Sequence, residues 1–473
     1  MAFNSVHFLI FFPVVLVLAW MLRRQMMLRL ALLLVASYYF YMSWNWMYAG
    51  LILGSTVLDY FAALGMGRSK SLRLRRVLLV TSLAGNLGVL FAFKYYNFFI
   101  DNVAQVFGLT GSQGGLAHHS LLLPVGISFY TFQTLSYTID VYRGKLAPTR
   151  NFLKFALFVS FFPQLVAGPI VRASHFLPQL DKQPQFDDRA AETGLGLILF
   201  GLFKKICLAD LLGVTLVDPI FADPGVCSPW TLIIGMYGYA FQIYYDFSGY
   251  SDIAIGVARM LGFHLPINFD RPYLATSMRN FWRRWHISLS SWLRDYLYIP
   301  LGGGKGTTSR TALNLAVVML LGGLWHGAAW PFVLWGAAHG VLLGLGRVFH
   351  RYTGIDADRG HQPFVSRVAR IAITFHLVAL CFVVFRSPDF ATLGVYFKTM
   401  VLSDGGTTSV GLVAYVVLVM AALLEWTPRS WAQQGSHLYA RLPSPLQACV
   451  VVSCVLLFAA AGGAGTPFIY FQF

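Results

Sequence analysis

The sequence has 473 residues, of which 57% are hydrophobic and only 11% are charged, whereas a soluble domain has about 25% charged residues. Long apolar stretches recur from end to end, which indicates a polytopic helical membrane protein and excludes both a soluble domain with one anchor and a β-barrel of short alternating segments. The 35 Lys and Arg residues outnumber the 19 Asp and Glu residues, but they are grouped between apolar runs, a pattern that orients membrane proteins and argues against nucleic-acid binding.

The N-terminal apolar run has no Lys or Arg before Arg23, and no small-residue cleavage site follows it. It is therefore predicted to be a first membrane helix and not a signal peptide. Most apolar segments have about the 20 residues that span a hydrocarbon core, and a few are predicted to be re-entrant or paired half-helices. The segments lie near 5–22, 30–46, 47–66, 77–93, 120–139, 152–170, 193–216, 228–246, 247–262, 312–329, 332–347, 369–386, 409–426 and 447–464.

Basic clusters separate these segments, with an even number of segments between one cluster and the next. All clusters are therefore predicted to be cytoplasmic, with the N-terminus extracytoplasmic. No orientation is assigned to 171–227, where Lys204 and Lys205 interrupt an apolar stretch. No repeat is evident, so 1–473 is predicted to form a single membrane domain. The clusters are Arg23/Arg24/Arg29, Arg68/Lys70/Arg73/Arg75/Arg76, Arg143/Lys145/Arg150, the segment 271–310, and Arg347/Arg351/Arg359.

The segment 279–299 combines aromatic residues with arginines. At helical spacing, one predicted stripe is apolar and consists of Trp282, Trp285, Leu289, Trp292 and Tyr296. The adjacent predicted stripe consists of Arg279, Arg283, His286 and Ser290. Such a helix is expected in the membrane interface. Either its arginines only bind lipid headgroups, or this face opens into a site for an anionic donor with His286 beside it.

His326 lies inside an apolar run, where an ionisable residue is costly and is a candidate for function by default. Gly322, Gly323 and Gly327 clear the helix surface beside it, which leaves room for a ligand or for a closely packed helix. A histidine bonded to a neighbouring helix is the structural alternative to catalysis. Pro331 is expected to break the helix, and irregular backbone at membrane depth is tolerated where it lines a cavity, which favours a site.

The other histidines are weaker candidates. His339 would point to a different face of an unbroken helix, and His376 is consistent with a hydrogen-bonded core residue. No spacing suggests metal ligands, and no metal site or disulfide framework is predicted. The histidines in loops or near segment ends are His118, His119, His175, His264, His350, His361 and His437.

Two long motifs, residues 281–300 and Gly322-Gly-Leu-Trp-His-Gly327, closely resemble the signatures of membrane-bound O-acyltransferases, and the nearest branch is the bacterial alginate O-acetylases. Residues 91–97, 124–133, 162–172 and 242–252 resemble that branch in the expected order. The resemblance spans about residues 90–347, and residues 348–473 are predicted to add membrane helices without diagnostic motifs.

The resemblance implies an all-α fold with a ring of roughly 11–14 membrane helices and re-entrant segments around a central tunnel, in the bacterial inner membrane. It implies transfer of an acetyl group from a cytoplasmic thioester, either acyl-CoA or an acyl carrier protein, with no bound cofactor. His326 is implied as the catalytic histidine and His286 as its donor-side counterpart. The expected donor-binding residues are Arg279, Arg283, Arg284 and Trp285, and the expected tunnel or site-shaping residues are Gly322, Gly323, Trp325, Gly327, Asp246 and Ser248.

The residue types in this sequence are suited to acyl transfer by a buried histidine. Attack of a hydroxyl on a thioester needs a base that is neutral near pH 7, which histidine supplies, and burial disfavours the charged imidazole. A membrane-embedded site excludes the water that would hydrolyse the acyl group. Because the sequence has no Gly-x-Ser-x-Gly elbow, direct transfer is expected and not a serine acyl-enzyme.

The expected acceptor is an alginate-like exopolysaccharide, with cellulose or teichoic acid as alternatives. Expected partners are membrane lipids, the acyl donor, an extracytoplasmic acetyltransferase and the polysaccharide synthesis machinery. A transporter whose histidines and arginines line a conduction path is the competing class, disfavoured by the absence of an inverted repeat. A non-catalytic scaffold for a polymer synthase is the third class of protein considered. The oligomeric state is left open.

Overall fold

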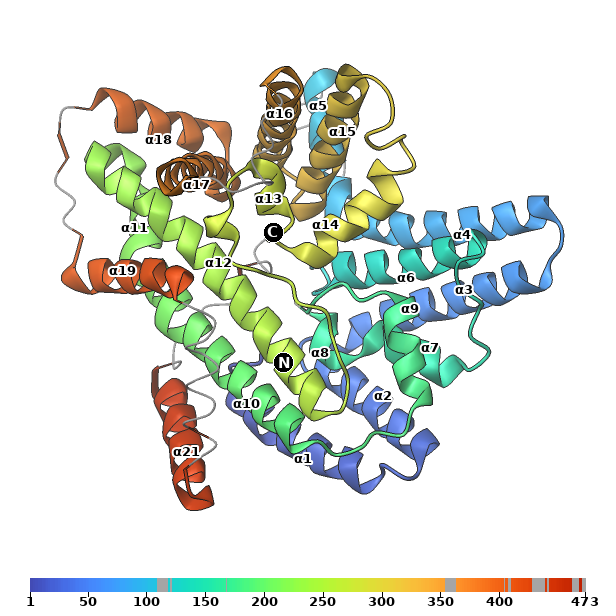
Figure 1. Ribbon diagram of the computed structural model, residues 1–473. Coiled ribbons are helices and arrows are strands. Elements are labelled where there is room, and N and C mark those ends of the chain that lie inside the picture. Colours follow the sequence, from blue (N-terminus) through green and yellow to red (C-terminus); the bar gives the residue numbers. More distant parts are fainter. Residues whose placement is uncertain are drawn as a thin grey trace. The chain divides into compact units, whose positions relative to one another are not determined.

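The computed structural model describes residues 1–108, 118–119, 121–166, 168–353, 363–403, 405–406, 410–427, 439, 442–461 and 468–469. These residues form helices and no strand, as the all-α prediction requires (Figure 1). Arg359, His361 and His437 lie outside the described residues.

Several helices are apolar enough for a membrane, which confirms the polytopic membrane fold. Those long enough to cross it are Trp46–Arg68, Leu72–Val106, Trp330–Thr353 and Phe364–Arg386. Shorter apolar helices are Val6–Met21, Met26–Met42, Phe390–Leu402, Leu412–Trp426 and Pro445–Cys454. The ring around a tunnel and the orientation of the N-terminus stay predictions.

The chain packs as two compact units, each with its own core. The first unit comprises Met1–Gly194 with Val257–Pro266, and the second comprises Leu195–Gly256 with Ile267–Phe473. The helices of the first unit are α1 (Val6–Met21), α2 (Met26–Met42), α3 (Ala49–Arg68), α4 (Leu72–Leu90), α5 (Tyr96–Val106), α6 (Ile127–Tyr142), α7 (Phe152–Ser160), α8 (Phe162–Leu165) and α9 (Ala173–Phe176).

Helices α3, α4 and α6 lie side by side and bury a carboxylate between them (Figure 1). Asp59 of α3 is fully buried and accepts hydrogen bonds from Ser82 Oγ at 2.6 Å and from Asn86 Nδ2 at 2.9 Å. These polar contacts replace the water that the carboxylate loses on burial. The first unit is therefore held together by polar as well as apolar contacts.

The predicted apolar segment 152–170 is not one helix. α7 ends at Ser160, and the short α8 begins at Phe162 with Pro163 in its first turn. Proline has no backbone N–H, and within a continuous helix its ring would clash with the carbonyl four residues earlier, so Pro163 lies in the first turn of a new helix and α7 ends before it.

The second unit begins within α10 (Asp188–Phe203), whose first residues belong to the first unit. Its further α-helices are α11 (Asp218–Ala222), α12 (Pro229–Met260, whose last residues belong to the first unit), α13 (Met278–Trp282), α14 (Ile287–Leu293), α15 (Thr308–His326), α16 (Trp330–Thr353), α17 (Phe364–Arg386), α18 (Phe390–Leu402), α19 (Leu412–Trp426) and α21 (Ser444–Ala461). Stretches of π-helix cover Lys204–Asp210, Gly213–Val217 and Arg294–Tyr298.

The predicted segments 228–246 and 247–262 form one helix, α12, of 32 residues. The polar residues at the predicted boundary do not interrupt it, because Asp246 is paired inside the protein with Lys205. Helices α15 and α16 lie side by side and antiparallel (Figure 1), since Gly323 faces Gly336 and Ala316 faces Gly340. This pair and the segment before it hold the candidate site.

Candidate active site

The segment 279–299 does not form the continuous helix predicted from its aromatic and arginine spacing. α13 ends at Trp282 and α14 begins at Ile287, because His286 between them has a left-handed backbone with φ of 41°. This turn separates the residues of the predicted polar stripe. Arg279 and Arg283 are exposed, whereas His286 has no exposed surface.

The aromatic stripe is likewise turned into the protein and not toward lipid headgroups. Its residues, Trp282, Trp285, Leu289, Trp292 and Tyr296, are all buried. The surface-helix interpretation of 279–299 is therefore wrong, because a residue with positive φ ends the helical periodicity on which it rested.

The protonation of His286 follows from its hydrogen bonds. Asn268 Oδ1 accepts from the backbone N–H of Ser288 at 3.2 Å, which identifies that amide atom as the oxygen. His286 Nδ1 lies 3.2 Å from the same oxygen and so must donate to it. In the neutral ring, Nε2 then carries the lone pair. Burial lowers the pKa of His286 to about 3, which keeps the imidazole neutral at physiological pH.

His326 is the last residue of α15 and is 4% exposed. Extended backbone at Gly327 ends the helix, and α16 starts at Trp330, so the predicted break near Pro331 is confirmed. The ring of Trp325 lies 5.0 Å from His326 and 6.1 Å from His286, measured between centroids. The structure thus brings both predicted histidines against one tryptophan.

The glycines beside His326 serve close helix packing, which was one of the two predicted uses. A Cβ atom on Gly323 would overlap the carbonyl oxygen of Phe332, and one on Gly327 would overlap the Phe332 ring. At Gly322 an added Cβ would lie 3.4 Å from the Leu293 side chain, so this position is less crowded. The packing shapes the site, because it brings α16 against His326.

The predicted donor-binding residues divide into two pairs. Arg279 and Arg283 are exposed at the surface of the second unit. Arg284 is half-buried, and its Nε donates to Asn280 Oδ1 at 2.9 Å. Trp285 is 2% exposed and packs in an aromatic cluster. The first pair is thus exposed, whereas Arg284 and Trp285 make contacts within the protein, and donor binding by these residues stays a prediction.

Asp246, predicted to shape the site, belongs to a buried ion pair. Its Oδ1 lies 2.6 Å from Lys205 Nζ, and its Oδ2 accepts from the backbone N–H of Ile469 at 2.8 Å. The next residue, Phe247, places its ring 4.6 Å from that of His286 at 88°. Asp246 therefore anchors the part of α12 that packs on His286. Ser248 is also buried on α12. The sequence interpretation missed Lys205 as the partner of Asp246.

His339 was also missed. It has no exposed surface and lies on α16, where its ring is 4.6 Å from that of Trp335, which in turn is 5.0 Å from His326. The expectation that His339 points elsewhere required an unbroken helix, and the break before α16 removes it. The predicted Pro331 break was the signal that could have revealed this neighbour.

His376 is hydrogen-bonded as predicted, but the prediction that it is a core residue is wrong, because its side chain is exposed. Its Nε2 accepts from Tyr237 Oη at 2.6 Å, and its Nδ1 donates to the carbonyl oxygen of Ala372 at 2.7 Å. Within the described ranges, no group of three or more His, Cys, Asp or Glu residues could hold a metal ion.

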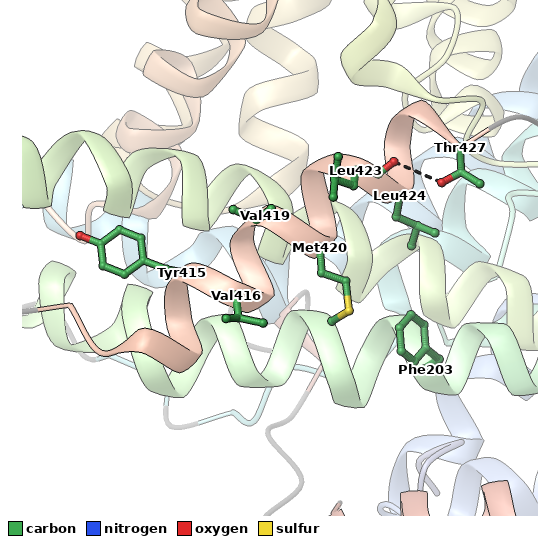
Figure 2. A pocket seen from close by; sticks show the side chains of 8 residues that line it. All are labelled: Phe203, Tyr415, Val416, Val419, Met420, Leu423, Leu424 and Thr427. Atoms are coloured by element: carbon green, nitrogen blue, oxygen red, sulfur yellow. Dashed lines mark hydrogen bonds between the residues drawn. The ribbon is translucent and has the colours of Figure 1, made fainter.

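An open groove of about 520 Å³ lies elsewhere in the second unit (Figure 2). Its lining is apolar apart from Tyr415 and Thr427, and the hydroxyl of Thr427 is bonded to the carbonyl oxygen of Leu423 at 3.1 Å. None of the candidate site residues lines it. The lining residues are Phe203 of α10, Tyr415, Val416, Val419, Met420, Leu423 and Leu424 of α19, and Thr427, which follows α19.

Comparison with known proteins identifies the family to which the chain belongs. The profile of the membrane-bound O-acyltransferase family matches residues 145–385, which include His286, His326 and His339. A probable alginate O-acetylase, AlgI, of Azotobacter vinelandii is 38% identical over 93% of this chain and 94% of its own length. The corresponding protein of Pseudomonas aeruginosa is 42% identical over 82% of this chain and 72% of its own length.

A peptidoglycan O-acetyltransferase of Helicobacter pylori is 37% identical over 79% of this chain and 74% of its own length. Relatives that acylate different polymers thus share most of this chain. The buried histidines lie inside the matched segment, in a helical membrane protein. The chain belongs to the membrane-bound O-acyltransferase family and is an O-acyltransferase.

Proposed function

We propose that this protein O-acetylates an exopolysaccharide, with an alginate-like polymer as the first choice of acceptor. The support is the 38–42% identity to proteins named as probable alginate O-acetylases, which extends over most of the chain. Teichoic acid D-alanyltransferases of Streptococcus thermophilus and Bacillus subtilis are 33% and 28% identical over only 56% and 58% of the chain. Acylation of teichoic acid is therefore the weaker alternative.

The observation that carries the catalytic proposal is the pair of buried histidines packed on Trp325. His326 would take the proton of the acceptor hydroxyl as its oxygen attacks the thioester carbonyl carbon. The carbon–sulfur bond then breaks, and the leaving thiolate takes the proton from His326. The products are the acetyl ester and a thiol, so the histidine returns to its neutral form without a covalent intermediate.

The tautomer of His286, with its proton on Nδ1, limits the roles that this side chain can have. With Nδ1–H on Asn268, its Nε2 accepts hydrogen bonds and cannot donate one to the thioester carbonyl. It would orient the donor by accepting from one of the donor's N–H groups. The exposed Arg279 and Arg283 would meet the anionic part of the donor, whether phosphates of acyl-CoA or the acidic surface of a carrier protein.

The location and partners are proposed on the same basis. The protein would lie in the bacterial inner membrane with its N-terminus extracytoplasmic, and an extracytoplasmic acetyltransferase would relay the acetyl group to the polymer made by its synthesis machinery. A reporter fused after Ser71 tests the orientation, because an extracytoplasmic signal there would contradict it.

Mass spectrometry of the surface polysaccharide tests the function. Cells that lack the protein should make the polymer without O-acetyl esters, and expression of the wild type should restore them. Export of an unmodified polymer that depends on this protein, with an unchanged ester content, would instead favour a transporter. A loss of polymer without any acyl transfer would favour the scaffold.

A further inference from the structure

Two buried ring nitrogens on α16, those of Trp335 and His339, lack a hydrogen-bond partner among the described residues. Trp335 is 1% exposed, and His339 has no exposed surface. In the part of the chain that the structure describes, neither Trp335 Nε1 nor His339 Nε2 has a hydrogen-bond partner. Buried polar groups are almost always paired, and an exception calls for an explanation such as a ligand.

Both orphaned atoms are donors. The indole nitrogen of tryptophan carries a proton and never accepts, so Trp335 Nε1 can only donate. Trp282 Nε1 likewise donates to His339 Nδ1, at 3.3 Å. Because Nδ1 accepts, neutral His339 holds its own proton on Nε2. Trp282 thus fixes the tautomer in which His339 presents an N–H group.

The rings that carry the two donors are in contact, and the Trp335 ring also contacts the proposed base. Trp335 and His339 are four residues apart on α16 and therefore share a helix face, and their ring centroids are 4.6 Å apart. Each of these neighbouring rings thus carries one N–H group that lacks a partner among the described residues. The Trp335 ring is 5.0 Å from His326 and stands edge-on to it at 86°.

We propose that Trp335 Nε1–H and His339 Nε2–H bind the carbonyl oxygen of the transferred acyl group. The proposal rests on the function proposed above, with His326 as base. When the acceptor oxygen bonds to the carbonyl carbon, the π electrons move to the carbonyl oxygen, and the two N–H groups stabilise the negative charge there. The electrons return as the carbon–sulfur bond breaks, while the proton passes from the hydroxyl through His326 to the thiolate.

An isostere separates hydrogen bonding from packing at Trp335. Substitution Trp335→3-benzothienylalanine, by suppression of an amber codon, replaces the N–H group with sulfur and keeps the ring shape. Because one lost oxyanion donor costs about 10²–10³ in kcat, the rate should fall by about 100-fold or more. The matched control is the same isostere at Trp292, a buried tryptophan that packs on Tyr296, and its rate should stay within about threefold of the wild type.

His339 provides a second, independent comparison. His339→Leu removes the donor and should lower the rate by about 100-fold, whereas His339→Gln places an amide N–H near the position of Nε2 and should recover much of it. The rate is the incorporation of radiolabelled acetate into base-labile esters of the surface polysaccharide, per amount of protein in the membrane. This assay does not require that the donor be known.

The results distinguish this proposal from the function on which it rests. If the Trp335 isostere works within about threefold of the wild type, Trp335 only packs and the proposal is overturned. If His339→Gln is as inactive as His339→Leu at equal protein levels, the donor role of His339 is overturned. His326→Asn serves as the separate control in the same cells, since normal incorporation by that variant would refute the base and not merely the oxyanion donors.

Discussion

Replacement of Gly323 by alanine should impair catalysis through the contact between α15 and α16. The added Cβ would overlap the Phe332 carbonyl oxygen and would lie 3.1 Å from Cα of Gly336, so backbone and not a flexible side chain must move. Overpacking of this kind costs about 1–3 kcal/mol. Displacement of α16 would also carry Trp335 away from His326, and a shift of about 1 Å at a reacting centre costs about 100-fold in rate.

The neighbouring glycine provides the control. A Cβ on Gly322 would meet only the Leu293 side chain, at 3.4 Å, and Gly-to-Ala in a helix gains about 1 kcal/mol in propensity. Gly322→Ala should therefore keep its activity and melt no earlier than the wild type, whereas Gly323→Ala should lose about 100-fold in acetate incorporation and melt earlier in detergent. Equal activity of the two variants would refute the claim that this helix contact positions the site.

Three further predictions concern His286 and its surroundings. Arg283→Ala should raise the apparent KM for the donor in steady-state kinetics with little change in kcat, because the exposed arginine supplies binding. Arg284→Ala should mainly lower the melting temperature, because its guanidinium is hydrogen-bonded to Asn280; the reverse pattern in the two variants would show that the roles are exchanged. Asp246→Ala removes one of the carboxylates that pair with the buried Lys205 and should cost about 3 kcal/mol in stability, measured by detergent melting. A change of under about 0.5 kcal/mol would contradict the anchoring role. Burial lowers the pKa of His286 from 6.5 to about 3, so in the folded protein this side chain is protonated only in strong acid. The plot of rate against pH between pH 5 and 8 should therefore have the same shape in the wild type and in His286→Asn. A fall in rate toward acid pH that is lost in the variant would show that His286 titrates in this range.

Much of the fold and part of the site could be predicted from the sequence. Composition was enough for the helical membrane class, and the cost of an intramembrane histidine was enough to single out His326. The break near Pro331 followed from the geometry of proline. These features depend on local chemistry, which the sequence displays directly.

The rest depends on contacts between distant residues. The left-handed turn at His286 is held by Asn268, whose carbonyl oxygen accepts from the backbone N–H of Ile287 at 2.9 Å, and nothing in the helical spacing of 279–299 indicates it. The Lys205–Asp246 pair joins residues far apart in the chain, and His339 reaches the site only because α16 folds back on α15. Periodicity within one segment does not predict such contacts.

The division of labour between the two predicted histidines is the central claim, and asparagine substitutions test it most directly. Asparagine keeps a polar amide but cannot act as a base near neutral pH. General base catalysis contributes about 10²–10⁴-fold, so His326→Asn should lose nearly all acetyl transfer at a normal membrane level, whereas His286→Asn should retain measurable transfer. The measurement is the O-acetyl content of the surface polysaccharide by mass spectrometry, with each variant expressed at the wild-type level. Normal transfer by His326→Asn with an inactive His286→Asn would move the base to His286, and normal transfer by both variants would contradict the enzyme mechanism altogether.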